Sequence, residues 1–317
     1  LGVDLRPADI ELTSDGEVLI VGSKGLIAES GEGITTIAEI SSGLFEDLQH
    51  VAFGNAGEGL VIQQSPDDPL IRTTNGGRDW ESIAAPDISV RDVAFHSDEF
   101  ALLLGRNGEV FRSDDLGEIW VDAGASSESF MSCLDVFDSE TWMTGGNGCI
   151  GRTANSGTSW SLGPVEGFVD AIDRFPGTDV VIAVGSKIHR SEDAGANWSG
   201  PVSTIASGDD VACLDETTAI AVSGSIYRTT DQGLTWENVL DSGSDDLYAI
   251  AALSALHAVA VGDDGLMFET VDGGESWSQV EIVGQPLLDI AVTGPLGSGV
   301  VMVGESGVVI GGFAPLE

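Results

Sequence analysis

An eight-residue pattern recurs through this chain and limits the folds that the chain can adopt. The pattern has a hydroxyl residue first, Asp or Asn third, Gly fifth and Trp eighth. Its six copies, called boxes below, are Thr73 to Trp80, Ser113 to Trp120, Thr153 to Trp160, Ser191 to Trp198, Thr229 to Trp236 and Thr270 to Trp277. The box tryptophans recur every 38 to 41 residues. A fixed signature with a period of about 40 residues is typical of a repeat architecture.

The residue types of the box predict a hairpin turn. An Asp or Asn side chain accepts hydrogen bonds from backbone N–H groups just ahead of it, and so closes a turn. The glycine supplies a positive φ at little steric cost. The tryptophan begins the next strand and contributes a large apolar surface. We therefore interpret the boxes as architecture, in preference to metal or catalytic sites.

The pattern resembles the Asp-box, or bacterial neuraminidase repeat, of β-propellers. The longer stretch Tyr227 to Trp236, in which an arginine directly precedes the box, is most similar to the photosystem II stability and assembly factor family. Five arginines hold this position: Arg72, Arg112, Arg152, Arg190 and Arg228. The resemblance implies a propeller but says little about function, because one scaffold hosts unrelated activities. That family has a basic patch, whereas lysine and arginine are scarce in this chain.

Each repeat is predicted to form four strands, a to d, between Gly- and Asp-rich turns. In the third repeat these are Val90 to Phe95, Phe100 to Leu104, Val110 to Ser113, and a fourth strand that opens at Trp120. Strand a recurs eight times between Ile10 and Ile290. We therefore predict one all-β domain over residues 1–317, a single closed β-propeller of eight four-stranded blades, with seven blades as the alternative. The last blade lacks a fourth strand, and Val3 to Leu5 are predicted to complete it and close the ring.

The charge balance excludes some partners. The chain has 52 acidic and 12 basic residues, a net charge of −40, which repels nucleic acid and anionic membrane surfaces. Because the acids are spread between apolar strands, we interpret them as an adaptation to high salt, which screens self-repulsion. An acidic surface that binds a basic partner is the alternative. No apolar run is long enough for a transmembrane segment, and the chain opens at Leu1 without Met, which leaves a removed leader open.

Enzymatic chemistry is weakly indicated. A sialidase needs an arginine triad and a Tyr nucleophile paired with Glu, but five of the arginines stand in the repeat position before a box. Tyr227 aligns with core residues of other repeats, which leaves Tyr248 alone. A sialidase-like glycoside hydrolase is therefore the least favoured function, and no catalytic residue is predicted.

No metal or cofactor site is predicted either. The four histidines lack metal-ligand spacing, and no calcium loop or glycine-rich phosphate loop is present. Paired turn acids such as Asp209-Asp210 are interpreted as solvated. The three cysteines are predicted to be free thiols, with a Cys133–Cys149 bridge as the alternative.

Binding specificity must come from positions where the repeats differ. Near the start of strand a, one register is acidic in four repeats: Asp9, Asp92, Asp210 and Asp289. We interpret it as structural. The preceding register varies: Ala8, Gln49, Arg91, Cys133, Asp209, Tyr248 and Leu288. From it we predict a binding surface of Arg91, Tyr248, Gln49 and Asp209, in which Arg91 pairs either with Asp92 or with a partner. The long loop Gln63 to Pro69 is the second candidate.

The favoured function is a non-catalytic propeller that binds another macromolecule through this surface. The partner is a protein or a surface glycan. Recognition of carbohydrate or of a cell-surface receptor, as in an envelope component, adhesin or virion attachment protein, is the alternative. An extracellular, cell-envelope or virion location in a high-salt environment is favoured over the cytoplasm.

Overall fold

A computed structural model describes residues 7–12, 18–22, 26–30, 37–41, 48–53, 58–63, 70–74, 80–96, 100–125, 130–200, 208–243, 246–252, 254–263, 266–281, 287–293, 299–304 and 309–311. Every element in these ranges is a β-strand. The strands are β1 (Pro7–Leu12), β2 (Val18–Gly22), β3 (Leu26–Ser30), β4 (Ile37–Ser41), β5 (Leu48–Phe53), β6 (Gly59–Gln63), β7 (Leu70–Thr73), β8 (Glu81–Ile83), β9 (Val90–His96), β10 (Phe100–Gly105), β11 (Glu109–Ser113), β12 (Val121–Ala125), β13 (Met131–Val136), β14 (Thr141–Ala154), β15 (Ser161–Arg174), β16 (Val181–Gly185), β17 (His189–Ser191), β18 (Asp210–Cys213), β19 (Ala219–Val222), β20 (Ser225–Thr229), β21 (Glu237–Asp241), β22 (Leu247–Ala252), β23 (Ala258–Gly262), β24 (Leu266–Thr270), β25 (Ser278–Glu281), β26 (Leu287–Thr293), β27 (Gly299–Gly304) and β28 (Val309–Gly311).

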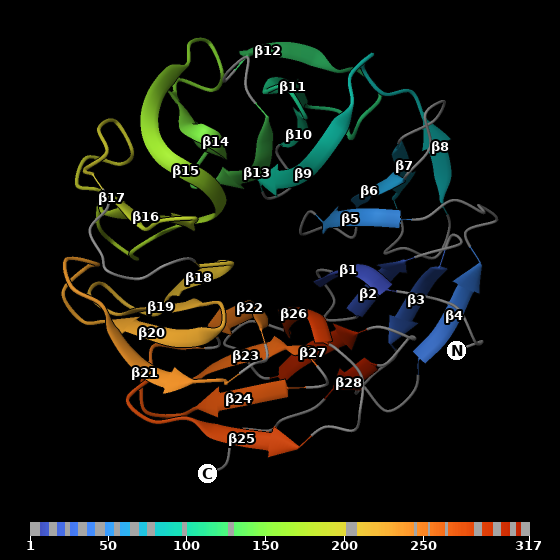
Figure 1. Ribbon diagram of the computed structural model, residues 1–317. Coiled ribbons are helices and arrows are strands. Elements are labelled where there is room, and N and C mark those ends of the chain that lie inside the picture. The colour runs from blue at the N-terminus through green and yellow to red at the C-terminus, as the bar shows by residue number, and fades with distance from the viewer. Residues whose placement is uncertain are drawn as a thin grey trace.

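The described strands form seven antiparallel sheets arranged around a common centre (Figure 1). In five of the sheets, four consecutive strands pair in chain order, as the repeat predicts. The first strand of each sheet lies nearest the centre, and β4, β8, β12, β21 and β25 lie at the outside (Figure 1). β1 lies beside both β5 and β26, so the first and last sheets are neighbours. The structure is therefore all-β with the layout of a propeller.

The fourth and fifth repeats depart from the expected layout. They share one five-stranded sheet, β13 to β17, because β15 is long enough to serve both. Its first part pairs with β14 up to Phe168, with a register shift after Pro164, and its last part, from Val169, pairs with β16. The last sheet has three strands, β26 to β28, within the described part of the chain. The predicted completing strand, Val3 to Leu5, and the loop from Gln64 to Pro69 lie outside the described residues.

The hydrophobic core lies between neighbouring sheets. Strands β10, β16 and β23 are buried along their whole length, because a second strand of a stacked sheet is covered on both faces and reads as a continuous apolar run. Each box tryptophan with a described environment packs against such an interface. Trp236, for example, packs against Phe175 and Ile182 of the preceding repeat. The three cysteines are free, so the Cys133–Cys149 bridge does not form.

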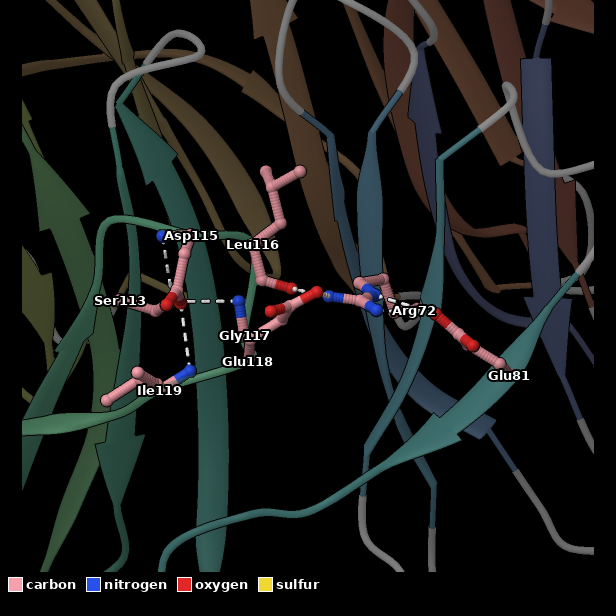
Figure 2. Close-up of polar contacts among 8 residues, drawn as sticks. All are labelled: Arg72, Glu81, Ser113, Asp115, Leu116, Gly117, Glu118 and Ile119. Atoms are coloured by element: carbon pink, nitrogen blue, oxygen red, sulfur yellow. Dashed lines mark hydrogen bonds and ion pairs between the residues drawn. The ribbon is translucent and has the colours of Figure 1, made fainter.

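The boxes form the predicted turns, as Ser113 to Ile119 illustrate in Figure 2. The Ser113 hydroxyl accepts the N–H of Gly117 at 2.7 Å and donates to Asp115 Oδ1 at 2.8 Å. The same carboxylate oxygen accepts the N–H of Ile119 at 2.8 Å. Hydrogen bonds from the Ser276 side chain and backbone lower the pKa of the equivalent Asp272 to about 2. The box acids are thus ionised acceptors with a structural task.

In the five boxes whose turn the structure describes, the residue before the box glycine also has a left-handed backbone conformation, which the sequence did not indicate. These residues are Leu116, Ser156, Ala194, Gln232 and Gly273, with φ between 52° and 72°. Their N–H groups can reach the turn between strands a and b, as from Gln232 to the carbonyl of Thr217 at 3.0 Å. Four of the five carbonyls accept a hydrogen bond from the box arginine of the preceding repeat. Arg190 Nε donates to the Gln232 carbonyl at 2.6 Å, and Arg72 Nη1 donates to the Leu116 carbonyl at 3.2 Å (Figure 2).

Four box arginines therefore join successive repeats. Arg72, Arg152, Arg190 and Arg228 each donate to the left-handed residue of the next box. Arg112 differs, because its guanidinium lies 4.0 Å over the Phe100 ring and its Nε donates to Asp114. A cation that is held by carbonyls or an aromatic ring inside the fold contributes to architecture rather than to a binding surface.

Candidate interaction surface

Seven of the eight inner segments carry a one-residue register shift near their start. Opposite β10, for example, Val90 pairs with Gly105 and Asp92 with Leu104, which leaves Arg91 between them. A β-bulge of this kind leaves one residue outside the ladder and turns its side chain away. The bulge residues are Ala8, Gln49, Arg91, Ser132, Asp170, Tyr248 and Leu288. Asp209 holds the equivalent place before β18, with its N–H bonded to Val222 at 2.7 Å.

The positions that vary between repeats in the sequence are therefore the bulge positions of the structure, with two corrections. Cys133 was assigned to it, but Cys133 pairs with Gly145 and the bulge residue is Ser132. Asp170 was missed, because β15 runs through two repeats and hides the start of its second part. The acidic register is placed as predicted, since Asp9, Asp92, Asp210 and Asp289 each pair with the last or next-to-last residue of strand b.

Glycine opposite the bulge holds it in place. A Cβ on Gly262 would lie 2.0 Å from the carbonyl oxygen of Asp246, and one on Gly185 would lie 2.0 Å from that of Phe168. No side chain fits at such a distance. The Asp246 carbonyl instead accepts the N–H of Asp263 at 2.9 Å. The bulge and the turn between strands b and c are thus bonded into one rigid unit, which positions Tyr248 and Asp263 together.

The bulges and the boxes lie on opposite faces of the molecule. The bulges stand beside the turns that join strands b and c, whereas the boxes contact the turns that join strands a and b. We call the first surface the bulge face. Its described side chains are Arg91, Arg106, Phe130, Ser132, Phe168, Asp170, Lys187, Asp209, Asp246, Tyr248 and Asp263.

One side of the bulge face is aromatic and cationic. The guanidinium of Arg106 lies 5.3 Å from the centre of the Phe130 ring, and the Phe130 and Phe168 rings are 5.6 Å apart. Arg106 and Lys187 are exposed, and both rings are half-buried. Arg91, also half-buried, belongs to β9 next to this group. Apart from the box arginines and Arg174, these are the cations whose side chains the structure describes.

The other side of the bulge face is anionic. The Tyr248 hydroxyl donates to Asp263 Oδ1 at 2.6 Å. This bond, followed by burial and by the charges of Asp263, Asp246 and Asp209, raises the pKa of Tyr248 to about 12. Burial and the nearby charges of Asp170 and Asp246 raise the pKa of Asp209. Tyr248 is thus a hydrogen-bonded, neutral side chain with its ring 37% exposed.

The structure therefore brings two of the four predicted residues together. Asp209, directly before β18, and Tyr248, on β22, belong to the anionic side. Arg91 and Gln49 belong to β9 and β5, on the other side of the centre (Figure 1). The side chain of Gln49 lies outside the described residues. Both oxygens of Asp92 accept backbone N–H groups, from Val93 at 2.8 Å and Leu134 at 2.9 Å, which is a structural role.

Three further features of the described residues lie outside the bulge register. Tyr227 packs in the core against Phe175 and Val211, as its alignment predicted. No group of three or more His, Cys, Asp or Glu side chains in the described ranges could hold a metal ion. Two surface hollows flank Trp198, one lined by Arg190 and Asn197, the other by Glu166 and His189. They lie away from the bulge register, and no described helix could cross a membrane.

Comparison with known proteins identifies the fold and a partial family match. Residues 85–233, just under half of the chain, match the family model of the photosynthesis system II assembly factor YCF48. No curated protein sequence matches the chain significantly.

Three solved structures illustrate the structural likeness. YCF48 from Cyanidioschyzon merolae is 16% identical, with a TM-score of 0.66 over 98% of this chain and 95% of that one. A YCF48 bound to a D1 peptide is 17% identical, with a TM-score of 0.68 over 98% and 92% of the two chains. The C-terminal WD40 domain of Sif2 is 10% identical, with a TM-score of 0.69 over 98% and 96%. The chain is thus an all-β protein of the propeller type, similar to the photosystem II assembly factors.

Proposed function

We propose that this protein is a non-catalytic binding propeller whose bulge face docks a protein segment. The observation that carries the proposal is the contrast between the two faces. The boxes repeat the same bonds from unit to unit, whereas the bulge register changes from Arg91 to Ser132, Asp170, Asp209 and Tyr248. A near-symmetric surface cannot select an asymmetric partner, so specificity belongs to the varied face. The similar YCF48 bound to a D1 peptide supports a protein partner over a glycan.

The proposed architecture is one closed propeller of eight blades over residues 1–317. Because β15 serves two repeats, the inner strands provide eight central segments, one for each predicted strand a. The neighbouring positions of β1 and β26 support closure between the first and last blades. A seven-bladed ring is the alternative, and the N-terminal segment is proposed to complete the last blade.

The high net charge is proposed to adapt the protein to a salt-rich environment. Four box arginines donate hydrogen bonds to the next repeat. Many of the few basic side chains are therefore bonded within the fold. The surface acids are left with few internal counter-charges. Salt must then supply the screening that a balanced surface provides for itself.

The proposal is tested by a double substitution on the bulge face. Arg91→Ala combined with Tyr248→Ala should weaken partner binding at least tenfold, about 1.4 kcal/mol, because it removes a cation and an exposed aromatic ring from opposite sides of the face. Affinity is measured by pull-down and titration in multimolar KCl, with the partner obtained from the source cells.

A box substitution provides the matched control. Asp231→Ala removes an acceptor of the N–H and hydroxyl of Thr235, at 2.9 and 2.6 Å, and should lower the free energy of unfolding by about 1–3 kcal/mol. Its folded fraction should bind the partner normally. Unchanged affinity in the double variant, lost affinity in the box variant, or competition by free sugars would each contradict the proposal.

A further inference from the structure

Inner-strand aspartates bridge successive repeats. Asp173 accepts the N–H of Arg174 in its own strand at 2.6 Å and that of Cys213 in the next repeat at 2.7 Å. Asp210 likewise accepts Val211 and Ile250, at 2.8 and 2.9 Å. Asp92 makes the same two bonds at the junction of the third and fourth repeats. At these three junctions, the carboxyl group accepts two backbone N–H groups, one from its own strand and one from the next repeat.

The junction of the fourth and fifth repeats breaks this pattern. Asp135 accepts the N–H of Val136 at 2.8 Å, and its second oxygen has no backbone donor among the described residues. The position of Asp135 relative to its bulge explains the difference. Asp135 lies three residues after the bulge residue of its strand, as Asp173 does, and Asp173 accepts an N–H four residues after the equivalent position of the next repeat. By the same offset, the partner of Asp135 across the junction would be the N–H of Arg174. Asp173 already accepts that N–H. This junction is joined instead by Ser132, whose hydroxyl donates to the Val169 carbonyl at 2.7 Å.

The surroundings of Asp135 disfavour a negative charge. Asp135 is half-buried. Its anionic neighbours are Asp173 on β15 and Asp92 on β9. The half-buried thiol of Cys133 and the buried thiol of Cys213 lie close to the same aspartates. Arg174 is the opposing cation, and its Nη1 lies 3.9 Å from Asp138. Burial, followed by the charge of Asp173, raises the pKa of Asp135 to about 7. Asp173 has a raised pKa from burial as well, but two backbone N–H groups favour its ionised form.

We propose that Asp135 is a proton-sensitive latch between the fourth and fifth repeats. The neutral carboxyl group lets β13 and β15 pack together through Ser132 and Val169. The ionised group repels Asp173 without a second donor to hold it, and so loosens the two strands directly beside the bulge residues Ser132 and Asp170. The device therefore couples proton concentration to the rigidity of one part of the bulge face.

The sign of the effect follows from the raised pKa. The folded state holds the Asp135 proton up to about pH 7, whereas an unfolded aspartate loses it near pH 3.9. The stability associated with this group is therefore fully present below about pH 4 and is lost as the pH rises through about 7. Ordinary box acids, with lowered pKa values, act in the opposite direction and at lower pH.

The test compares the wild type with Asp135→Asn in multimolar KCl at pH 5, 6.5 and 8. The substitution keeps the shape but removes the titration. We expect the melting temperature of the wild type to fall between pH 5 and 8 by at least about 3 °C more than that of the variant. Hydrogen exchange in β13 and β15 should be faster in the wild type than in the variant at pH 8, and equal at pH 5.

Glu166→Gln is the matched control, because it removes an exposed acid from β15, the strand that also carries Asp173, and should leave the wild-type pH profile unchanged. Parallel profiles for wild type and Asp135→Asn, or an equal change in Glu166→Gln, would overturn the proposal. Should Asp135→Asn fail to fold, carbon-detected NMR of the wild-type Asp135 carboxyl group decides the matter. A midpoint near pH 7 supports the latch, and one below pH 5 refutes it.

Discussion

Raising KCl from about 0.1 M to about 3 M should increase the melting temperature of this protein by on the order of 10 °C or more, because the Debye length falls from about 10 Å to less than 3 Å. The net charge of −40 is the reason. At low ionic strength the surface acids repel one another across several Å, and unfolding relieves this repulsion. At high ionic strength only the closest pairs still interact.

Thermal unfolding in a KCl series measures the effect, with two controls. Sucrose at matched water activity separates charge screening from the general exclusion of solutes, which also favours the folded state. A variant with several surface acids changed to their amides should start from a higher melting temperature at low salt and gain less from KCl. A flat or falling profile in the wild type would reject the adaptation to salt.

Trp142→Ala should be among the most damaging single substitutions, at a cost of about 3–5 kcal/mol in free energy of unfolding. Trp142 is fully buried in the core between the third and fourth repeats. Its ring lies 5.3 Å from the ring of Phe100 and 6.4 Å from that of Trp160, and the Arg112 guanidinium lies 5.7 Å from it. Truncation leaves a large cavity and removes a surface on which that cation rests.

Urea unfolding at fixed, high KCl measures the loss, with Trp142→Phe and Trp236→Ala as comparisons. The phenylalanine variant retains an aromatic ring and should lose markedly less. Trp236 is only half-buried, so its truncation should cost less than that of Trp142. If both truncations lowered the free energy of unfolding equally, burial would not determine the contribution of a tryptophan. The box position of Trp236 would then compensate for its smaller burial.

Much of the fold was predictable because the repeat is visible as a recurring pattern of residue types. The box specifies its own turn, and the predicted strands of the third repeat agree with β9, β10 and β11 to within one residue. Trp142 was not identified as core, because it lies outside the boxes and repeats no pattern. Its importance follows from packing between two sheets, which a one-dimensional pattern does not contain.

The bulge face was only partly predictable because backbone contacts determine it. The sequence found the variable register through alignment, but it assigned Cys133 where Ser132 stands and missed Asp170. The bulge depends on the Phe168 carbonyl approaching Gly185, a contact between main-chain atoms. The glycines that end strand b, such as Gly105, Gly185 and Gly262, were the available signal. The hydrogen bonds from the box arginines to the carbonyls of the left-handed residues could not be predicted from the sequence, which shows only that an arginine precedes the box.

Site-specific photo-crosslinking tests the central claim, that the partner binds the bulge face and not the boxes. A photoreactive phenylalanine analogue replaces Tyr248 on the bulge face in one variant and Leu234 in a box turn in another. Both native side chains are exposed, by 37% and 52%. In multimolar KCl with the purified partner, we expect a crosslinked complex from position 248 and none from position 234. A complex formed from position 234 alone would contradict it.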